Sequence, residues 1–216
     1  MKRFAIILSG SGVYDGSEIH EATMTMLAII QQECTYDCFA PNIKQHHVVN
    51  HLTGEVTDEQ RNVLVESARI ARGDIKSLDD FDANEYDAVI FPGGFGVAKN
   101  FSNFAFEGEN CTVIPEITRV IVEMNRLDKP IGALCISPVL IAKVLENSTL
   151  TIGNDEATAK QIVNMGATHV NTSYGEVIAD KKNKVFTTPC YMLDSNIADI
   201  YDGSFNLIKS ILENMS

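Results

Sequence analysis

Short apolar runs alternate with segments of helical periodicity along most of the chain. Residues 3–8 are almost wholly apolar, which is typical of a strand buried on both faces of a sheet. In residues 17–32 the apolar side chains recur at helical spacing: Ile19, Ala22, Met26, Ile29 and Ile30. Asp15 and Glu18 precede this periodic run and have the spacing of a capping box. The first unit is therefore predicted to be a strand followed by a helix.

The same alternation continues to the end of the chain. Further strands are predicted at 36–40, 86–91 and 130–134, and helices at 57–72, 115–128 and 136–146. After Gly153 we expect a smaller unit, with a helix at 155–165, a strand at 168–171, a hairpin around 180–183 and a final helix at 195–213. This order predicts an α/β fold, in which helices cover both faces of a mostly parallel sheet. No repeat or linker interrupts it, so residues 1–216 are predicted to form one domain.

Composition narrows the classes of function. Of the 216 residues, 45% are hydrophobic and 21% are charged, as in soluble globular proteins. No segment reaches the roughly 18 consecutive apolar residues of a membrane span. With 17 basic and 29 acidic side chains, the net charge of -12 disfavours binding to nucleic acids or to anionic membranes.

The five cysteines are an odd number for a disulfide framework, and none forms a CxxC pair. Free thiols indicate a reducing compartment. The apolar run at residues 4–8 is shorter than the roughly 7–15 residues of a signal-peptide core. We therefore expect a cytoplasmic protein.

Three unusual segments follow predicted strands. A glycine-rich connection spans residues 9–16, Pro92-Gly93-Gly94-Phe95-Gly96 ends the strand at 86–91, and Cys135 ends the strand at 130–134. Open α/β sheets bind their ligands beyond the carboxyl ends of parallel strands. We therefore expect the three segments to meet at one site.

Cys135 has the sequence context of a nucleophile at a sharp strand-to-helix turn. Such a turn requires small neighbours, and Ala133 and Ser137 lie two residues to either side. The start of a helix favours a thiolate, and Pro138 is tolerated in a first helical turn. The alternative is that Cys135 is a small buried apolar residue at the end of a strand.

An acidic partner for this thiol is predicted in the first strand–helix connection. Glu18 is placed to lie beside the Cys135 sulfur, where burial would raise its pKa and allow it to move a proton. The alternative is that Glu18 only caps the helix. Glu21 and His20 are competitors for the proton-transfer role.

Other residues are weaker candidates. Gly93 and Gly94 could present backbone amides to an oxyanion or simply permit a tight turn, and Ile136 and Asn100 are candidates for substrate binding. His51 and His169 could complete a Cys–His pair, but nothing local distinguishes them. A lysine-containing phosphate loop at Lys99 and a dinucleotide fingerprint at Gly10–Gly16 match their motifs only in part, and Cys111 and Cys190 are interpreted as structural.

Taken together, these motifs resemble the ElbB (sigma cross-reacting, enhancing lycopene biosynthesis) family. That family belongs to the class I glutamine amidotransferase-like superfamily, with the PfpI proteases and the parkinsonism-associated deglycase. The resemblance rests on five segments in order: Ser9 to Ala22, Asn50-His51-Leu52-Thr53-Gly54-Glu55, Pro92 to Asn100, Cys135-Ile136-Ser137-Pro138 and Thr187-Thr188-Pro189.

The resemblance implies a flavodoxin-like sandwich that is usually a homodimer, with Cys135 as the nucleophile and Glu18 as its acidic partner. It also implies a glyoxalase that acts on glyoxal without glutathione, metal or organic cofactor and that is loosely linked to isoprenoid biosynthesis. In this interpretation the thiolate attacks one aldehyde, Glu18 moves a proton, and the Gly93 and Gly94 amides stabilise the oxyanion. The alternative function is a non-catalytic redox sensor or partner-binding scaffold, in which Cys135 is oxidised.

Overall fold

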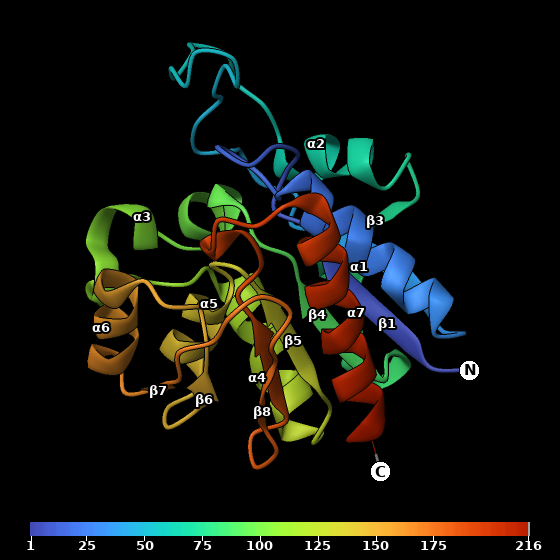
Figure 1. Ribbon diagram of the computed structural model, residues 1–216. Coiled ribbons are helices and arrows are strands. Elements are labelled where there is room, and N and C mark those ends of the chain that lie inside the picture. The colour runs from blue at the N-terminus through green and yellow to red at the C-terminus, as the bar shows by residue number, and fades with distance from the viewer. Residues whose placement is uncertain (216) are drawn as a thin grey trace.

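A computed structural model of the chain describes residues 1–215. Its centre is a seven-stranded sheet in the order β3-β2-β1-β4-β5-β9-β8 (Figure 1). The strands are β1 (Arg3–Ile7), β2 (Thr35–Ala40), β3 (Ile75–Ser77), β4 (Ala88–Phe91), β5 (Ile131–Leu134), β8 (Ile178–Asp180) and β9 (Val185–Thr188). Neighbouring strands pair in parallel except for β8, which is antiparallel to β9. The predicted mostly parallel α/β sheet is confirmed.

Helices cover both faces of this sheet (Figure 1). On one face α1 (Ile19–Gln31) packs against α7 (Ile197–Glu213), and on the other lie α4 (Pro115–Arg126) and α5 (Pro138–Val144). The remaining helices are α2 (Val63–Ile70), α3 (Phe104–Glu107) and α6 (Glu156–Asn164). A separate two-stranded sheet pairs β6 (Thr149–Leu150) with β7 (Thr168–His169). In the part of the chain that the structure describes, no helix is long and apolar enough to cross a bilayer.

The two layers of helices explain why β1 is apolar at nearly every position. Phe4 and Ile6 belong to the core beneath α1 and α7, whereas Ala5 and Ile7 belong to the core on the opposite face. Alternate side chains of a strand point to opposite faces, so a strand covered on both faces must be apolar throughout. β4 follows the same rule and is completely buried.

The segment before α2 differs from its prediction as a helix over 57–72. The helix begins only at Val63, and the Asn62 side chain caps it by accepting from the Val65 amide at 3.1 Å. Thr57 instead donates to the Val48 carbonyl at 3.2 Å, which helps to close an arm formed by residues 44–62. The arm projects from the top of the molecule in Figure 1.

The predicted capping box at the start of α1 is also corrected. Asp15 is buried and accepts from the Val49 amide of the arm at 2.7 Å, so it does not cap the helix. Glu18 is itself the capping residue, and its carboxylate accepts from the Glu21 amide at 2.7 Å. Asp15 therefore binds the arm, whereas Glu18 caps α1.

Candidate active site

Cys135 lies at the sharp bend between β5 and α5. Its backbone has a φ of 59°, which is rare for a residue other than glycine and indicates a conformation held by its surroundings. The Cys135 amide donates to the Thr188 carbonyl at 3.0 Å, and the Ser137 hydroxyl donates to the Pro92 carbonyl at 2.7 Å. The bend fixes the thiol at the carboxyl edge of the sheet, with only 9% of the residue exposed.

Glu21 is the carboxyl group that contacts this thiol. It projects from the first turn of α1 and is completely buried. One oxygen accepts from the Gly93 amide at 2.9 Å and the other from the Tyr191 amide at 3.2 Å, and the carboxyl also hydrogen-bonds to Cys135. Burial, with a smaller contribution from the nearby Glu18 carboxylate, raises the pKa of Glu21 to about 8.

Burial also raises the pKa of the Cys135 thiol, and the neighbouring Glu21 carboxylate raises it further. The Gly94 amide acts in the opposite direction by hydrogen-bonding to the sulfur. Two negative charges in contact inside the protein are strongly unfavourable, so the pair retains at least one proton at neutral pH. A thiol and a carboxyl that share a proton can form a nucleophile and return the proton to a reacting group.

The structure corrects the placement of Glu18. Its carboxylate caps α1 and lines the cavity above Cys135, but Glu21 makes the contact with the sulfur. The signal for Glu21 is present in the sequence. It lies one residue before Ala22, inside the buried stripe of α1 that continues to Thr25 and Ile29. A carboxyl in such a stripe requires buried polar partners, which is the mark of a functional group.

The two predicted oxyanion glycines have different surroundings. The Gly93 amide donates to Glu21, and a Cβ on Gly93 would lie 2.4 Å from the Glu21 carboxylate and 2.5 Å from the Cys135 Cβ. Gly94 has a φ of 102°, lines the cavity and hydrogen-bonds to the sulfur through its amide. Ile136 also lines the cavity, directly after the elbow cysteine, where a backbone amide can face an oxyanion.

Asn100 does not bind substrate in this arrangement, which corrects the prediction. Its amide nitrogen donates to the Ser9 and Asp15 carbonyls, both at 2.9 Å, and its oxygen accepts from the His46 amide at 2.8 Å. The side chain is buried and lies outside the lining of the cavity. Asn100 instead joins the glycine-rich loop to the arm.

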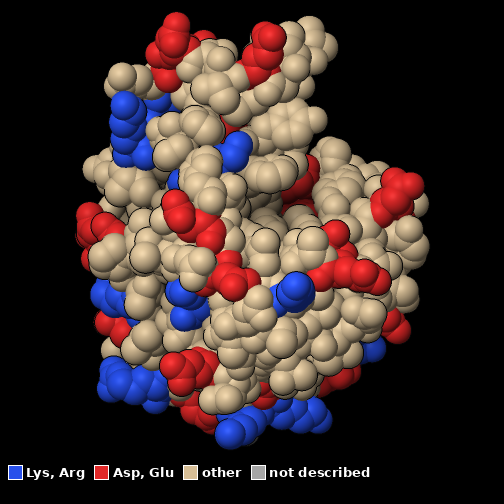
Figure 2. Space-filling view, turned by 90° about the vertical axis from the view of Figure 1, so that its left-hand side faces the viewer, with Lys and Arg blue, Asp and Glu red and all other residues tan. Residues whose placement is uncertain are grey.

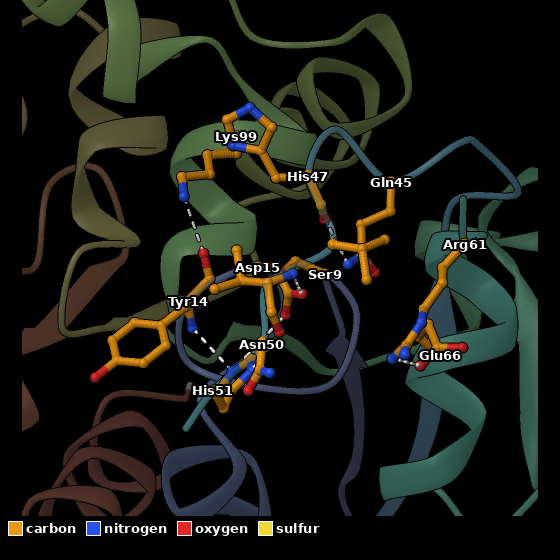
Figure 3. Close-up of polar contacts among 12 residues, drawn as sticks. Ser9, Tyr14, Asp15, Gln45, His47, Asn50, His51, Arg61, Glu66 and Lys99 are labelled. Carbon is orange, nitrogen blue, oxygen red and sulfur yellow. Dashed lines mark hydrogen bonds and ion pairs between the residues drawn. The ribbon is translucent and has the colours of Figure 1, made fainter. Parts of the chain in front are cut away.

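The two histidines considered as partners of Cys135 are hydrogen-bonded elsewhere. His51 accepts from the Tyr14 amide at 3.2 Å through one ring nitrogen and lies 3.0 Å from the Val49 carbonyl through the other. In Figure 3 it lies beside Asp15. His169 accepts from the Ile152 amide at 3.2 Å in the smaller unit. Glu21 is thus the acid or base that these contacts place on the thiol.

The partial phosphate-binding motifs also have structural roles. The Lys99 amine donates to the Tyr14 carbonyl at 3.0 Å (Figure 3). In the glycine-rich loop, the Gly10 amide donates to the Ser67 hydroxyl and the Gly12 amide to the Ser17 carbonyl, both within 2.9 Å. A phosphate site requires free amides, so these contacts weigh against nucleotide binding there.

A cavity of about 450 Å³ opens above Cys135. Apolar side chains form much of its wall: Val13, Phe95, Phe104, Ile136 and Met192. Glu18, Asp155, Thr158 and Tyr191 provide polar groups. Figure 2 shows a recess on this side of the molecule with acidic atoms inside it. Within residues 1–215, no group of three or more histidine, cysteine or acidic side chains is arranged to hold a metal ion.

Comparisons with known proteins show similarity along nearly the whole chain. It is 44% identical over 221 residues to the rat "ES1 protein homolog, mitochondrial". The aligned region covers 98% of this chain and 83% of the rat protein. The chain is equally similar to the human "Glutamine amidotransferase-like class 1 domain-containing protein 3, mitochondrial", with 98% and 82% covered. No protein-family model matches the chain.

Solved structures support the fold. The crystal structure of an isoprenoid biosynthesis protein with an amidotransferase-like domain from Ehrlichia chaffeensis has a TM-score of 0.93, at 38% identity over the full length of both chains. Drosophila melanogaster DJ-1beta has a TM-score of 0.58 at 16% identity, with 99% of this chain and 90% of that chain covered. The predicted amidotransferase-like architecture is confirmed.

The predicted cytoplasmic location is contradicted by the relatives. The similar proteins from rat, human and zebrafish are all named as mitochondrial. Five buried free cysteines weigh against an oxidising compartment, but they do not distinguish one reducing compartment from another. Free cysteines therefore do not identify which reducing compartment holds the protein.

Proposed function

The chain belongs to the ES1 family of glutamine amidotransferase-like class 1 proteins, and from this premise we propose that it is a glyoxalase that converts glyoxal to glycolate without glutathione. The observation that carries the proposal is the buried contact between Glu21 and Cys135. This contact supports the proposal because it joins a thiol that lines the cavity to a buried carboxyl that can carry its proton.

The first step is addition of the Cys135 sulfur to one aldehyde carbon of glyoxal. The thiol proton passes through Glu21 to the new oxygen, which gives a hemithioacetal. Gly94 and Ile136 both line the cavity, and the Gly94 amide already contacts the sulfur, so these two backbone amides are the candidates for stabilising the oxyanion that forms during addition.

The second step moves a hydrogen between the two carbons. Glu21 as carboxylate removes the proton from the carbon that carries sulfur, which gives an enediolate, and then returns it to the neighbouring carbon. The product is the glycolyl thioester of Cys135. Water hydrolyses this thioester to glycolate, and the thiol is restored. Overall, glyoxal and water give glycolate and a proton, with no external oxidant or reductant.

A redox sensor at Cys135 is less well supported by the same geometry. Oxidation by peroxide depends on thiolate character and on solvent access. Cys135 lines the cavity and can be reached there, but the pKa of its thiol is raised, so the thiolate that peroxide oxidises is disfavoured. Glutamine hydrolysis by a Cys–His pair also lacks support, since His51 and His169 contact other groups.

The proposal is tested by following glyoxal consumption and glycolate formation with the purified protein. We expect turnover by the wild type and its loss in Cys135→Ser. Cys34→Ser is the matched control. Cys34 is also buried, but it lies just before the amino end of β2, whereas Cys135 lies at the carboxyl end of its strand. Retained turnover in Cys135→Ser would contradict the proposed chemistry, and rapid peroxide oxidation of Cys135 without turnover would favour the sensor.

Three finer predictions remain attached to this proposal. Assignment to the ElbB family rests on the motifs named in the sequence analysis. A link to isoprenoid biosynthesis is supported by the name of the Ehrlichia chaffeensis protein, which is 38% identical to this chain. A homodimer remains a prediction, to be measured by sedimentation.

A further inference from the structure

The cavity above Cys135 is much larger than glyoxal. Its volume of about 450 Å³ lies within the range of roughly 300–1,000 Å³ that is usual for pockets binding small organic ligands. Glyoxal is a two-carbon dialdehyde and would occupy a small part of this space. A ligand that filled the cavity would need a substituent on the carbon away from the sulfur.

The wall next to Cys135 is suited to an apolar substituent. Phe104 is 9% exposed and therefore rigidly packed, while Phe95, at 48% exposure, lies nearer the solvent. Ile136 and Met192 add aliphatic and thioether surface. Aromatic rings favour contacts with other rings in offset or edge-on arrangements, so a flat substituent fits this lining.

The charges at the cavity exclude an anionic substituent. Glu18 and Asp155 are its charged lining residues, and both are acidic. Lys99 lies nearby, but its amine is held by the Tyr14 carbonyl at 3.0 Å and lies 5.2 Å from the centre of the Phe95 ring. Substrates with a carboxylate or phosphate would meet acidic groups without a paired cation. The hydroxy acid product is an anion, so repulsion from Glu18 and Asp155 favours its release.

On the premise of the glyoxalase proposed above, we propose that the preferred substrate is an uncharged α-oxoaldehyde with an apolar substituent about the size of a phenyl ring. Its aldehyde carbon bonds to the Cys135 sulfur, and its substituent fills the cavity beside Phe104 and Met192. Glyoxal is then a poor substrate, because it can react with Cys135 and Glu21 but is too small to contact the apolar wall of the cavity.

The turnover test compares glyoxal, phenylglyoxal and 4-carboxyphenylglyoxal, each normalised to its reaction with a small thiol in solution. We expect kcat/KM for phenylglyoxal to exceed that for glyoxal by at least about tenfold. The carboxylated substrate should fall at least about tenfold below phenylglyoxal, since it has the same shape with a negative charge. Equal values for the three substrates, or the reverse order, would overturn the proposal.

A binding test separates this inference from the proposed reaction. Cys135→Ala protein is titrated by calorimetry with 2-hydroxyacetophenone, hydroxyacetone and 4-(hydroxyacetyl)benzoate, none of which requires turnover. Preferential binding of 2-hydroxyacetophenone supports the proposal that the cavity binds an uncharged, phenyl-sized substituent, even if glyoxal is not converted. If hydroxyacetone or the benzoate binds as well, the cavity assignment fails, whatever the outcome with glyoxal.

A variant pair locates the substituent. Ala105 is exposed on α3 and lines the cavity, so Ala105→Phe would fill part of the space without disturbing the core. We expect it to lower the ratio of phenylglyoxal to glyoxal kcat/KM by at least about tenfold. Ala157→Phe is the control, because Ala157 is exposed on α6 and is not part of the lining. An unchanged ratio in Ala105→Phe would contradict the position assigned to the substituent.

Discussion

Glu21 and Cys135 form a hydrogen-bonded acid–thiol pair in which only Cys135 lines the cavity. The carboxyl lies behind the sulfur and is fixed there by two backbone amides, those of Gly93 and Tyr191. These amides come from the connections after β4 and β9, so two segments far apart in the sequence hold one carboxyl group. The arrangement makes the charge of Glu21 sensitive to pH around 8 rather than around its usual pKa of 4.5.

Stability is expected to fall as pH rises across the titration of Glu21. The carboxyl stays protonated up to about pH 8 in the folded protein, whereas in the unfolded chain its pKa is near 4.5. Between these values the unfolded chain binds fewer protons, so deprotonation favours unfolding by at most about 1.4 kcal/mol per pH unit. Urea unfolding of the wild type and Glu21→Gln at a series of pH values measures this, and the variant should show a smaller fall.

The control for this series is Glu107→Gln. Glu107 is exposed at the end of α3, and its substitution should leave the wild-type dependence on pH unchanged. Equal slopes for the wild type and Glu21→Gln would contradict the raised pKa of Glu21.

Gly93→Ala is expected to separate the acid from the thiol. The new methyl group would lie 2.4 Å from the Glu21 carboxylate and 2.5 Å from the Cys135 Cβ, distances at which one of them must move. We expect glyoxal kcat to fall at least about a hundredfold, since proton transfer depends on this contact. Gly54→Ala is the control for strain away from the site, because nothing lies within 4 Å of that position while its φ of 76° is unfavourable for alanine. Stability is expected to fall there, but glyoxal kcat is not. Near wild-type kcat in Gly93→Ala, measured with its melting temperature, would mean that the contact is dispensable.

Asn100→Ala is expected to weaken the fold and leave the chemistry intact. The substitution removes two buried hydrogen bonds, to Ser9 and Asp15, and a partly buried one from the His46 amide. The free energy of unfolding should fall by about 2–4 kcal/mol, since the partner groups are left unsatisfied. The KM for glyoxal should not change when rates are normalised to folded protein. A raised KM without loss of stability would restore Asn100 as a substrate-binding residue.

The sequence predicts the sheet well because its strands are marked by burial. β1 and β4 are apolar at almost every position; Pro92 follows β4 directly, and the glycine-rich connection begins two residues after β1. β3 was not predicted, because a three-residue edge strand with a lysine in its middle has no such signal. The start of α2 was placed too early, since Thr57 bonds within the arm rather than to the helix.

The sequence predicts the nucleophile of the site but not which carboxyl is its acidic partner, because a local pattern marks only the nucleophile. Cys135 follows from the local pattern, because small residues surround a strand-to-helix bend. Its acid follows only in part: the buried stripe of α1 includes Glu21, but whether Glu18 or Glu21 reaches the sulfur depends on how α1 is rotated against the sheet. The path of the loop before α1 sets that rotation through long-range contacts, including the hydrogen bond from the Glu18 amide to the Gly93 carbonyl at 2.9 Å.

The last prediction separates proton transfer by Glu21 from positioning of the thiol. At neutral pH the Glu21 carboxyl is mostly protonated, and the glutamine that replaces it carries no charge either, so Glu21→Gln does not make the Cys135 thiol harder to ionise. Iodoacetamide labelling of Cys135 at neutral pH, followed by mass spectrometry, should therefore be at least as fast as in the wild type. Glyoxal turnover should nevertheless fall at least about a hundredfold, because glutamine cannot carry the proton between the two carbons. Labelling of buried Cys111 reports any unfolding in the same sample. If labelling of Cys135 and turnover fall together, Glu21 only holds the sulfur in place, and another group must move the proton.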